Sequence, residues 1–226
     1  MAKPVPKNLY PALGYIAPFL VYVGLMGMER AFSVQPLVGY PIRAALTLLV
    51  LLLVSRRCTK LGPARPLASI GIGLVVFAVW IGPDALFGYR HHGLFENFVM
   101  GSASGSLPLD LRRNPVFLLI RAAGSALLVP IVEELFWRAW LMRWLIERDF
   151  ESVPLGTYLP SAFWITAVLF ASEHGSYWEV GLAAGVIYNW WMIRTKSLAD
   201  CILAHAVTNG ALAAYVVTAG AWRYWL

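Results

Sequence analysis

Residues 115–137 read PVFLLIRAAGSALLVPIVEELFW, an apolar run in which only Arg121, Glu133 and Glu134 are charged. A helix needs about 20 mostly apolar residues to cross the hydrocarbon core of a bilayer, because that core is about 30 Å thick and each residue rises about 1.5 Å. The run therefore predicts a membrane-spanning helix, which we expect to continue to about Arg148.

Six further apolar runs are of similar length. They cover residues 9–28, 38–54, 67–87, 159–175, 177–193 and 198–220. The composition agrees, since 59% of the residues are hydrophobic and 13% are charged, whereas a soluble domain carries about 25% charged residues. The sequence predicts an all-α, polytopic transmembrane helical bundle with about seven membrane helices, in the range of roughly six to eight. We expect residues 1–226 to form a single integral membrane domain.

The basic residues stand at the ends of the apolar runs and form no dense face, so the net charge of +6 does not indicate nucleic-acid binding. We expect Cys58, in a basic loop, and Cys201, in an apolar run, to be free thiols with structural roles. Met28-Glu29-Arg30 follows the first run where a signal peptide would have a small-residue cleavage site. The first run is therefore predicted to be a membrane helix.

The distribution of basic residues predicts the orientation, because cytoplasmic connections carry an excess of Lys and Arg. The connections on the N-terminal side hold Lys3, Lys7, Arg56, Arg57, Lys60, Arg65, Arg143, Arg148, Arg194 and Lys196, and those on the other side hold Arg30, Arg90, Arg112, Arg113 and Arg223. This ten-to-five excess puts the N-terminus inside, in what we expect to be a bacterial inner membrane. The connection over residues 88–114 is then an outer loop, predicted to be flexible over Gly101–Ser106. Its adjacent His91 and His92 are more simply solvated than metal-binding.

Ionisable side chains within a bilayer are costly, so each one is a candidate functional residue. Glu134 and Arg138 are four apart and share one helical face, with the carboxylate N-terminal to the guanidinium, the better order for a pair. On its own this pair is more simply structural. Glu133 points about 100° away around the helix. A carboxyl left in apolar surroundings beside a second carboxyl is a candidate acid or base.

Two further pairs of residues have the same spacing of four. Phe170 and His174 close one apolar run, and His205 and Asn209 lie inside the last one. Singly, such residues are more simply packing residues or links between helices. Together with Glu133 they suffice for peptide hydrolysis, because a water held between a carboxylate and a histidine can attack a carbonyl. A His and an Asn can donate hydrogen bonds to the oxyanion that forms.

The three patterns, in this order, resemble the CAAX-protease and bacteriocin-processing family, also called CPBP or Abi. Its type II CAAX prenyl endopeptidases carry Glu-Glu-x-x-x-Arg, Phe-x-x-x-His and His-x-x-x-Asn. The resemblance covers residues from about 120 to 215, within a motif-bearing core of about residues 115–220. The N-terminal half shows only a weaker similarity to the CAAX-protease-related proteins found beside exosortase systems in bacteria.

The resemblance implies an intramembrane protease whose cavity faces the cytosol. It implies that Glu133 and His174 activate the hydrolytic water and that His205 and Asn209 form the oxyanion hole. The pair of Glu134 and Arg138 would then support and orient the site. The substrate is expected to be a membrane-anchored peptide or protein.

The resemblance leaves the metal requirement open. The preferred prediction requires no cofactor, and the alternative is a divalent metal such as zinc, held by Glu133, His174 and His205. Other protease signatures, His-Glu-x-x-His and Gly-x-Ser-x-Gly, are missing from the sequence, as is a nucleotide-binding P-loop.

Two rival functions follow from the same residues. One is a non-catalytic membrane protein that binds a partner in the same pocket, as an immunity protein or scaffold would. The other is a small proton-coupled transporter in which Glu133, His174 and His205 relay protons. The absence of a detectable repeat between the two halves of the sequence weakens the transporter hypothesis.

The predicted boundaries of the run at residues 159–175 conflict with the proposed grouping of Glu133, His174 and His205. With the runs above, Glu133 and His205 lie toward the inner face, whereas His174 lies at the outer end of its short run. If the three side chains converge, the run at residues 159–175 must start below the membrane surface or end within the bilayer. Irregular backbone at such a depth is tolerated only where it lines a cavity or is buried by protein.

Overall fold

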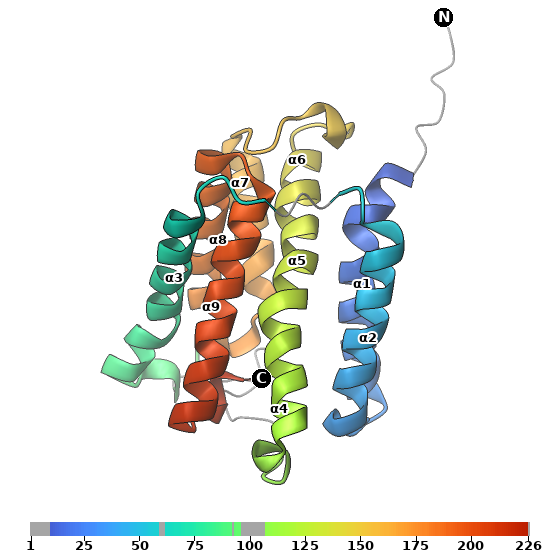
Figure 1. The fold of residues 1–226 in the computed structure, drawn as a ribbon. Helices are drawn as coiled ribbons and strands as arrows, with labels where there is room; N and C mark the ends of the chain where they lie inside the picture. Colours follow the sequence, from blue (N-terminus) through green and yellow to red (C-terminus); the bar gives the residue numbers. More distant parts are fainter. Residues whose placement is uncertain (1–9, 59–61, 92, 96–106, 226) are drawn as a thin grey trace, which may run out of the picture.

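A computed structural model of the chain describes residues 10–58, 62–91, 93–95 and 107–225. Within these residues seven helices run along one axis as a bundle (Figure 1). They are α1 (Tyr10–Ala31), α2 (Pro36–Val54), α3 (Pro66–Phe87), a long helix (Pro115–Trp144), α7 (Pro160–Ser172), α8 (Trp178–Thr195) and α9 (Leu198–Ala219). The long helix comprises α4 (Pro115–Ala123), α5 (Val129–Glu134) and α6 (Met142–Trp144), joined by the π-helical segments η3 (Gly124–Leu128) and η4 (Leu135–Leu141).

Each of the seven predicted apolar runs coincides with one of these helices. No strand occurs in the part of the chain that the structure describes, so the prediction of an all-α bundle is confirmed. Five helices, namely α1, α2, α3, the long helix and α9, are long and apolar enough to cross a membrane. The chain is therefore an integral membrane protein.

Proline marks the start of four helices. Pro36, Pro66, Pro115 and Pro160 occupy the first or second helical position. Proline is favoured there because the first N–H groups of a helix have no partner within it and the ring already sets a helical φ. The side chains of Asn114 and Ser197 additionally cap the long helix and α9 by accepting a hydrogen bond from the first turn.

Helix α7 is shorter than the run at residues 159–175 predicts. Its 13 residues span about 20 Å, less than the roughly 30 Å of a hydrocarbon core. The chain then turns through Glu173, His174 and the 3-10 segment η6 (Gly175–Tyr177) into α8, which returns to the same end of the bundle (Figure 1). The predicted C-terminal boundary of this run at residue 175 is therefore wrong, because the helix ends at Ser172. That the run ends within the bilayer stays a prediction.

The long helix lies between two groups of helices. The α1–α2 pair packs on one side of it, and on the other side α3, α7, α8 and α9 pack together (Figure 1). Close approach within the second group depends on glycine. A Cβ at Gly73 would collide with the backbone of Ala204 in α9, and one at Gly185 would lie 3.2 Å from the Phe170 ring in α7.

The two ends of the bundle are named as follows. The N-terminal face holds the start of α1, the end of α2, the start of α3, and the connections on either side of α7–α8. The distal face holds the α1–α2 turn at residues 32–35, the end of α3, the start of the long helix and the end of α9 (Figure 1).

The remaining predictions about the connections have mixed outcomes. Cys58 and Cys201 are free thiols, as expected. Part of the connection at residues 88–114 is ordered against the bundle, since the Arg90 side chain is buried and its Nη2 lies 2.6 Å from Glu179 Oε1 in α8. The predicted flexible run Gly101–Ser106 and the second residue of the His91-His92 pair lie outside the described residues.

Candidate active site

The long helix carries two adjacent glutamates with different surroundings. Glu134 is fully buried, and its Oε1 accepts a hydrogen bond from Nη1 of the equally buried Arg138 at 3.1 Å. The predicted pairing along one helical face is therefore present. The segments η3 and η4, in which the hydrogen-bond pattern widens to that of a π-helix, flank the glutamates on both sides. Such π-segments occur frequently at functional sites.

His205 in α9 joins the two glutamates. Its Nδ1–H donates to Glu134 Oε1 at 2.9 Å, and its Nε2 lies 4.0 Å from Glu133 Oε2. A carboxylate bonded to one ring nitrogen sets the orientation of the imidazole and aims the other nitrogen. Glu134 thus turns Nε2 of His205 toward Glu133.

Arg138 is held by partners that the sequence analysis missed. Its Nε donates to Asn189 Oδ1 at 3.0 Å, and Asn189 Nδ2 donates in turn to the carbonyl of Phe163 in α7. The guanidinium also lies over the Phe170 ring, 4.4 Å from its centroid. Asn189 is a polar residue inside an apolar run, which is the signal that could have identified it.

The ring of Tyr188 forms the wall behind His205. The two rings are stacked with centroids 4.9 Å apart, and the Tyr188 hydroxyl donates to Thr208 Oγ1 at 2.7 Å. Thr208 in turn donates to the carbonyl of Gly73 in α3. The sequence analysis missed Tyr188 and Thr208, although Thr208 lies between the two residues of the His205–Asn209 pattern.

His174 lies at the turn between α7 and α8. Because a carbonyl can only accept, the 2.8 Å contact of Nδ1 with the Phe170 carbonyl makes Nδ1–H the donor and leaves Nε2 as an acceptor. The ring also contacts Phe170, at 4.7 Å between centroids, and Trp80 in α3, at 5.2 Å. The Phe-x-x-x-His spacing thus places the carbonyl and ring of Phe170 where both orient His174.

Asn209 reaches from α9 to the long helix. Its Nδ2 donates to the carbonyl of Ser125 in η3 at 2.9 Å. That bond takes one of the two Nδ2 hydrogens and leaves the other for a further acceptor.

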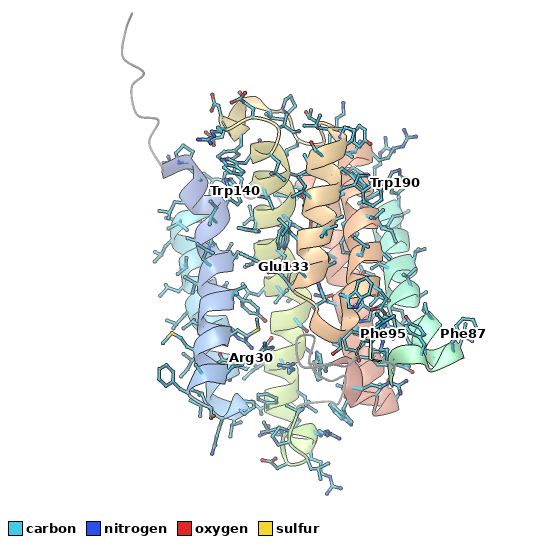
Figure 2. All side chains as sticks on the ribbon, turned by 180° about the vertical axis from the view of Figure 1, so that it is seen from behind. Arg30, Phe87, Phe95, Glu133, Trp140 and Trp190 are labelled. Carbon is cyan, nitrogen blue, oxygen red and sulfur yellow. The ribbon has the colours of Figure 1, made fainter. Side chains whose placement is uncertain are left out.

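The predicted catalytic residues share one cavity. It has a volume of about 720 Å³, and Glu133, His174, His205 and Asn209 all line it. Glu133 Oε2 is buried and has no hydrogen-bond partner among the described residues. Along the bundle axis, Glu133 lies between Trp140 and Arg30 (Figure 2). Trp140 belongs to the same long helix and is nearer the N-terminal face, whereas Arg30 belongs to α1 and is nearer the distal face.

The predicted supporting residues lie behind the cavity wall. Glu134 and Arg138 are absent from the lining and fully buried. The six residues predicted to have catalytic or supporting roles are thus divided into four that face the cavity and two that hold one of those four in place.

The zinc alternative requires three protein ligands that lie close together. The donor atoms of Glu133, His174 and His205 suit zinc by type. Yet in the described part of the chain no three side chains of His, Cys, Asp or Glu lie close enough together to hold a metal ion. The arrangement therefore does not fit a zinc site, and metal dependence stays a prediction for chemical test.

The fold and the site are those of a polytopic helical membrane protein with ionisable groups around an internal cavity. Residues 115–211 match the family model described as Type II CAAX prenyl endopeptidase Rce1-like. The chain therefore carries an Rce1-like domain over this segment, so the resemblance drawn from the three patterns is confirmed. The domain supports a CAAX-type intramembrane protease in general. No curated protein and no solved structure matches the chain. The match names no subgroup, and the similarity to exosortase-associated proteins stays a prediction.

Proposed function

We propose that the protein is an endopeptidase that cleaves a peptide bond of a membrane-anchored substrate with a water molecule activated by Glu133 and His174. The observation that carries the proposal is the convergence of Glu133, His174, His205 and Asn209 on one cavity from three separate parts of the chain. Neither the scaffold nor the transporter hypothesis is favoured by an observation of this kind.

The proposed reaction uses the free atoms of the site. The water lies between a Glu133 oxygen and Nε2 of His174, both of which can accept its hydrogens. Glu133 takes one proton as the water oxygen attacks the substrate carbonyl carbon. The proton then passes to the leaving nitrogen as the carbon–nitrogen bond breaks, which leaves a carboxylic acid and an amine.

The oxyanion of the tetrahedral intermediate is assigned to His205 and Asn209. Asn209 offers its second Nδ2 hydrogen, and His205 donates from Nε2 when it is protonated at both nitrogens, with Nδ1–H held by Glu134. A single oxyanion donor contributes about 100-fold to 1,000-fold to a rate, and a general base contributes about 100-fold to 10,000-fold.

The test is a cleavage assay with purified protein in detergent and lipid-anchored peptides that carry a fluorophore and a quencher. Glu133→Gln is expected to lower the rate by about 100-fold or more, and Asn209→Ala by a comparable factor. Glu147→Gln is the control, because Glu147 is an exposed glutamate in the connection that follows the long helix, away from the site. Wild-type cleavage by Glu133→Gln would refute the proposed base, and binding without cleavage would favour the scaffold hypothesis.

A chelation arm of the same assay addresses the cofactor. Incubation with a strong chelator, followed by metal analysis of the protein, is expected to leave cleavage unchanged. Loss of cleavage that added zinc restores would contradict the metal-free reaction and support the ligand set Glu133, His174 and His205.

A further inference from the structure

The cavity that holds the catalytic residues is also lined by a second group of charged side chains. They are Glu29 and Arg30 of α1, Arg43 of α2 and Arg121 of the long helix. The group contains three cations and one anion, and none of the four has a part in the proposed reaction. Because charged side chains are costly within a bilayer, those that line an internal cavity are candidate functional residues.

The buried Arg43 side chain uses only part of its hydrogen-bonding capacity. Its Nε lies 3.4 Å from Glu29 Oε1. Its Nη1 is buried and has no hydrogen-bond partner among the described residues. A buried donor without an acceptor is destabilising. An anion bound in the cavity next to Arg43 would remove that cost.

Tyr40 connects Arg43 to Arg121. The centroid of its ring lies 5.2 Å from Cζ of Arg43 and 5.0 Å from Cζ of Arg121, so the two guanidinium carbons are at most about 10 Å apart. The Tyr40 hydroxyl donates to the Arg121 carbonyl at 3.0 Å. Contact with an aromatic ring holds a guanidinium in place without neutralising its charge. The pair therefore suits a carboxylate, whose two oxygens match the N–H groups of guanidinium.

This group lies at a fixed distance from the proposed site of cleavage. Arg121 and Glu133 are 12 positions apart on the same long helix, which is about 18 Å at about 1.5 Å per residue. An extended peptide covers that length with about five residues, at about 3.3 Å each. The remaining charged residues of the lining, Glu133 and Glu173, are both acidic. A substrate carboxylate is therefore attracted to the arginines and repelled from the catalytic residues.

We propose that Arg43 and Arg121 form a subsite for a carboxylate that the substrate carries about five residues from the scissile bond. The carboxylate belongs either to the C-terminus of the substrate or to an acidic side chain. Its binding fixes the position of the peptide along the cavity and so selects the bond that lies next to Glu133. The identity of the ligand as substrate rests on the proposed peptidase function, whereas the preference of the cavity for a carboxylate does not.

The first test measures binding by fluorescence anisotropy, with wild-type protein and Glu133→Gln in detergent. The probes are three N-palmitoylated peptides of one sequence that contains no acidic residue. One ends in a free carboxylate, one ends in an amide, and one ends in an amide but has a glutamate near its end. At least one of the two carboxylate peptides is expected to bind about tenfold tighter than the plain amide, and which one does so identifies the source. Equal affinity for all three peptides would overturn the proposal.

Substitutions then test the two arginines. Arg43→Gln and Arg121→Gln are each expected to bring the ratio of carboxylate to amide affinity close to one, with the affinity for the amide unchanged. A side chain that only stabilises the fold would not alter this ratio. Arg113→Gln is the control, because Arg113 is an exposed cation outside the cavity lining, and it should keep the wild-type ratio. An unchanged ratio in both cavity variants would show that these arginines do not bind the carboxylate.

The cleavage assay on the same peptides separates this proposal from the peptidase function. The loss of the carboxylate is expected to raise KM about tenfold with little change in kcat, and moving the glutamate along the peptide should move the cleaved bond with it. If carboxylate peptides bind preferentially and none is cleaved, the peptidase function fails and the anion subsite stands. If peptides are cleaved with the same KM whether or not they carry a carboxylate, the function stands and the subsite is refuted.

Discussion

At the scale of single residues, the adjacent glutamates of the long helix have opposite relations to the fold. Glu134 is bound on both sides, by Arg138 and by His205, and no part of it is exposed. Glu133 faces the cavity, and its Oε2 lacks a hydrogen-bond partner in the described structure. Glu134 therefore stabilises the fold and orients His205, whereas Glu133 keeps an unpaired carboxylate oxygen in the cavity.

This difference predicts that replacing glutamate with glutamine lowers the stability of the fold by different amounts at the two positions. Glu134→Gln leaves the Arg138 guanidinium buried without its counter-charge, and loss of one partner of a buried ion pair costs about 3–5 kcal/mol. Glu133→Gln breaks no hydrogen bond among the described residues and is expected to leave stability unchanged. Thermal unfolding in detergent should show a clear fall in Tm for Glu134→Gln alone, although both variants lose activity. An equal fall for both would contradict the division between the two glutamates.

Asn189 is predicted to support the site through Arg138. Asn189→Ala removes the acceptor of Arg138 Nε and the donor to the Phe163 carbonyl, and a hydrogen bond to a charged group contributes about 1.5–3 kcal/mol. We expect a lower Tm and a lower kcat with little change in KM. Trp190→Ala, at the neighbouring exposed position, is the control. If Asn189→Ala behaved like that control, Arg138 would not depend on Asn189.

At the scale of elements, the small-residue pattern in α8 is part of the site. A Cβ at Gly181 would lie 3.1 Å from the His174 ring, and the hydrogen bond to the Phe170 carbonyl leaves that ring little freedom to move. Gly181→Ala is therefore expected to lower kcat by about tenfold or more, because a small misplacement of a catalytic group is costly. Gly71→Ala is the matched control in α3, where a Cβ meets nothing within 4 Å. Comparable activity of the two variants would show that α8 tolerates the added methyl group.

The helices and the spacings within each helix could be predicted from the sequence. Length and apolar composition located all seven helices, since the thickness of a bilayer sets the length of the run. Because a helix has 3.6 residues per turn, residues four apart lie on one face, so Glu134 contacts Arg138 and the carbonyl of Phe170 contacts His174. The depth at which α7 ends was inferred only from the requirement that His174 reach Glu133.

Contacts between helices could not be predicted in the same way. Glu134 and His205 are 71 residues apart, and Arg138 and Asn189 are 51 apart. Which turns of two helices face each other depends on packing, here on glycines such as Gly73 and Gly185, and the sequence pattern of a single helix does not contain that information. For the same reason the sequence could suggest a site but not which helices form the walls of its cavity.

At the scale of the whole molecule, the site is completed by helices outside the Rce1-like segment. Residues 115–211 supply the four proposed catalytic residues. The cavity walls also include Met26 of α1, Tyr40 and Arg43 of α2, and Trp80 of α3. The N-terminal helices therefore shape the cavity around Glu133, and differences in substrate among proteins of this kind are expected to depend on such helices.

The orientation of the whole bundle is predicted to depend on the cations of the N-terminal face. Arg56, Arg57 and Arg65 are exposed in the connection between α2 and α3. Replacing all three with Gln removes three of the ten basic residues on that side and reduces the charge difference that orients the chain. Gln35, in the α1–α2 turn, is exposed on the opposite face. In a Cys58→Ala background, the fraction of Gln35→Cys that an impermeant maleimide labels in intact cells is expected to fall, as part of the population inserts the other way round.

The matched control for that experiment removes charge from the opposite face. Arg113→Gln and Arg223→Gln, both at exposed distal positions, widen the difference between the faces and should leave labelling of Gln35→Cys complete. If the triple variant also stays fully labelled, the orientation is set by features other than these arginines.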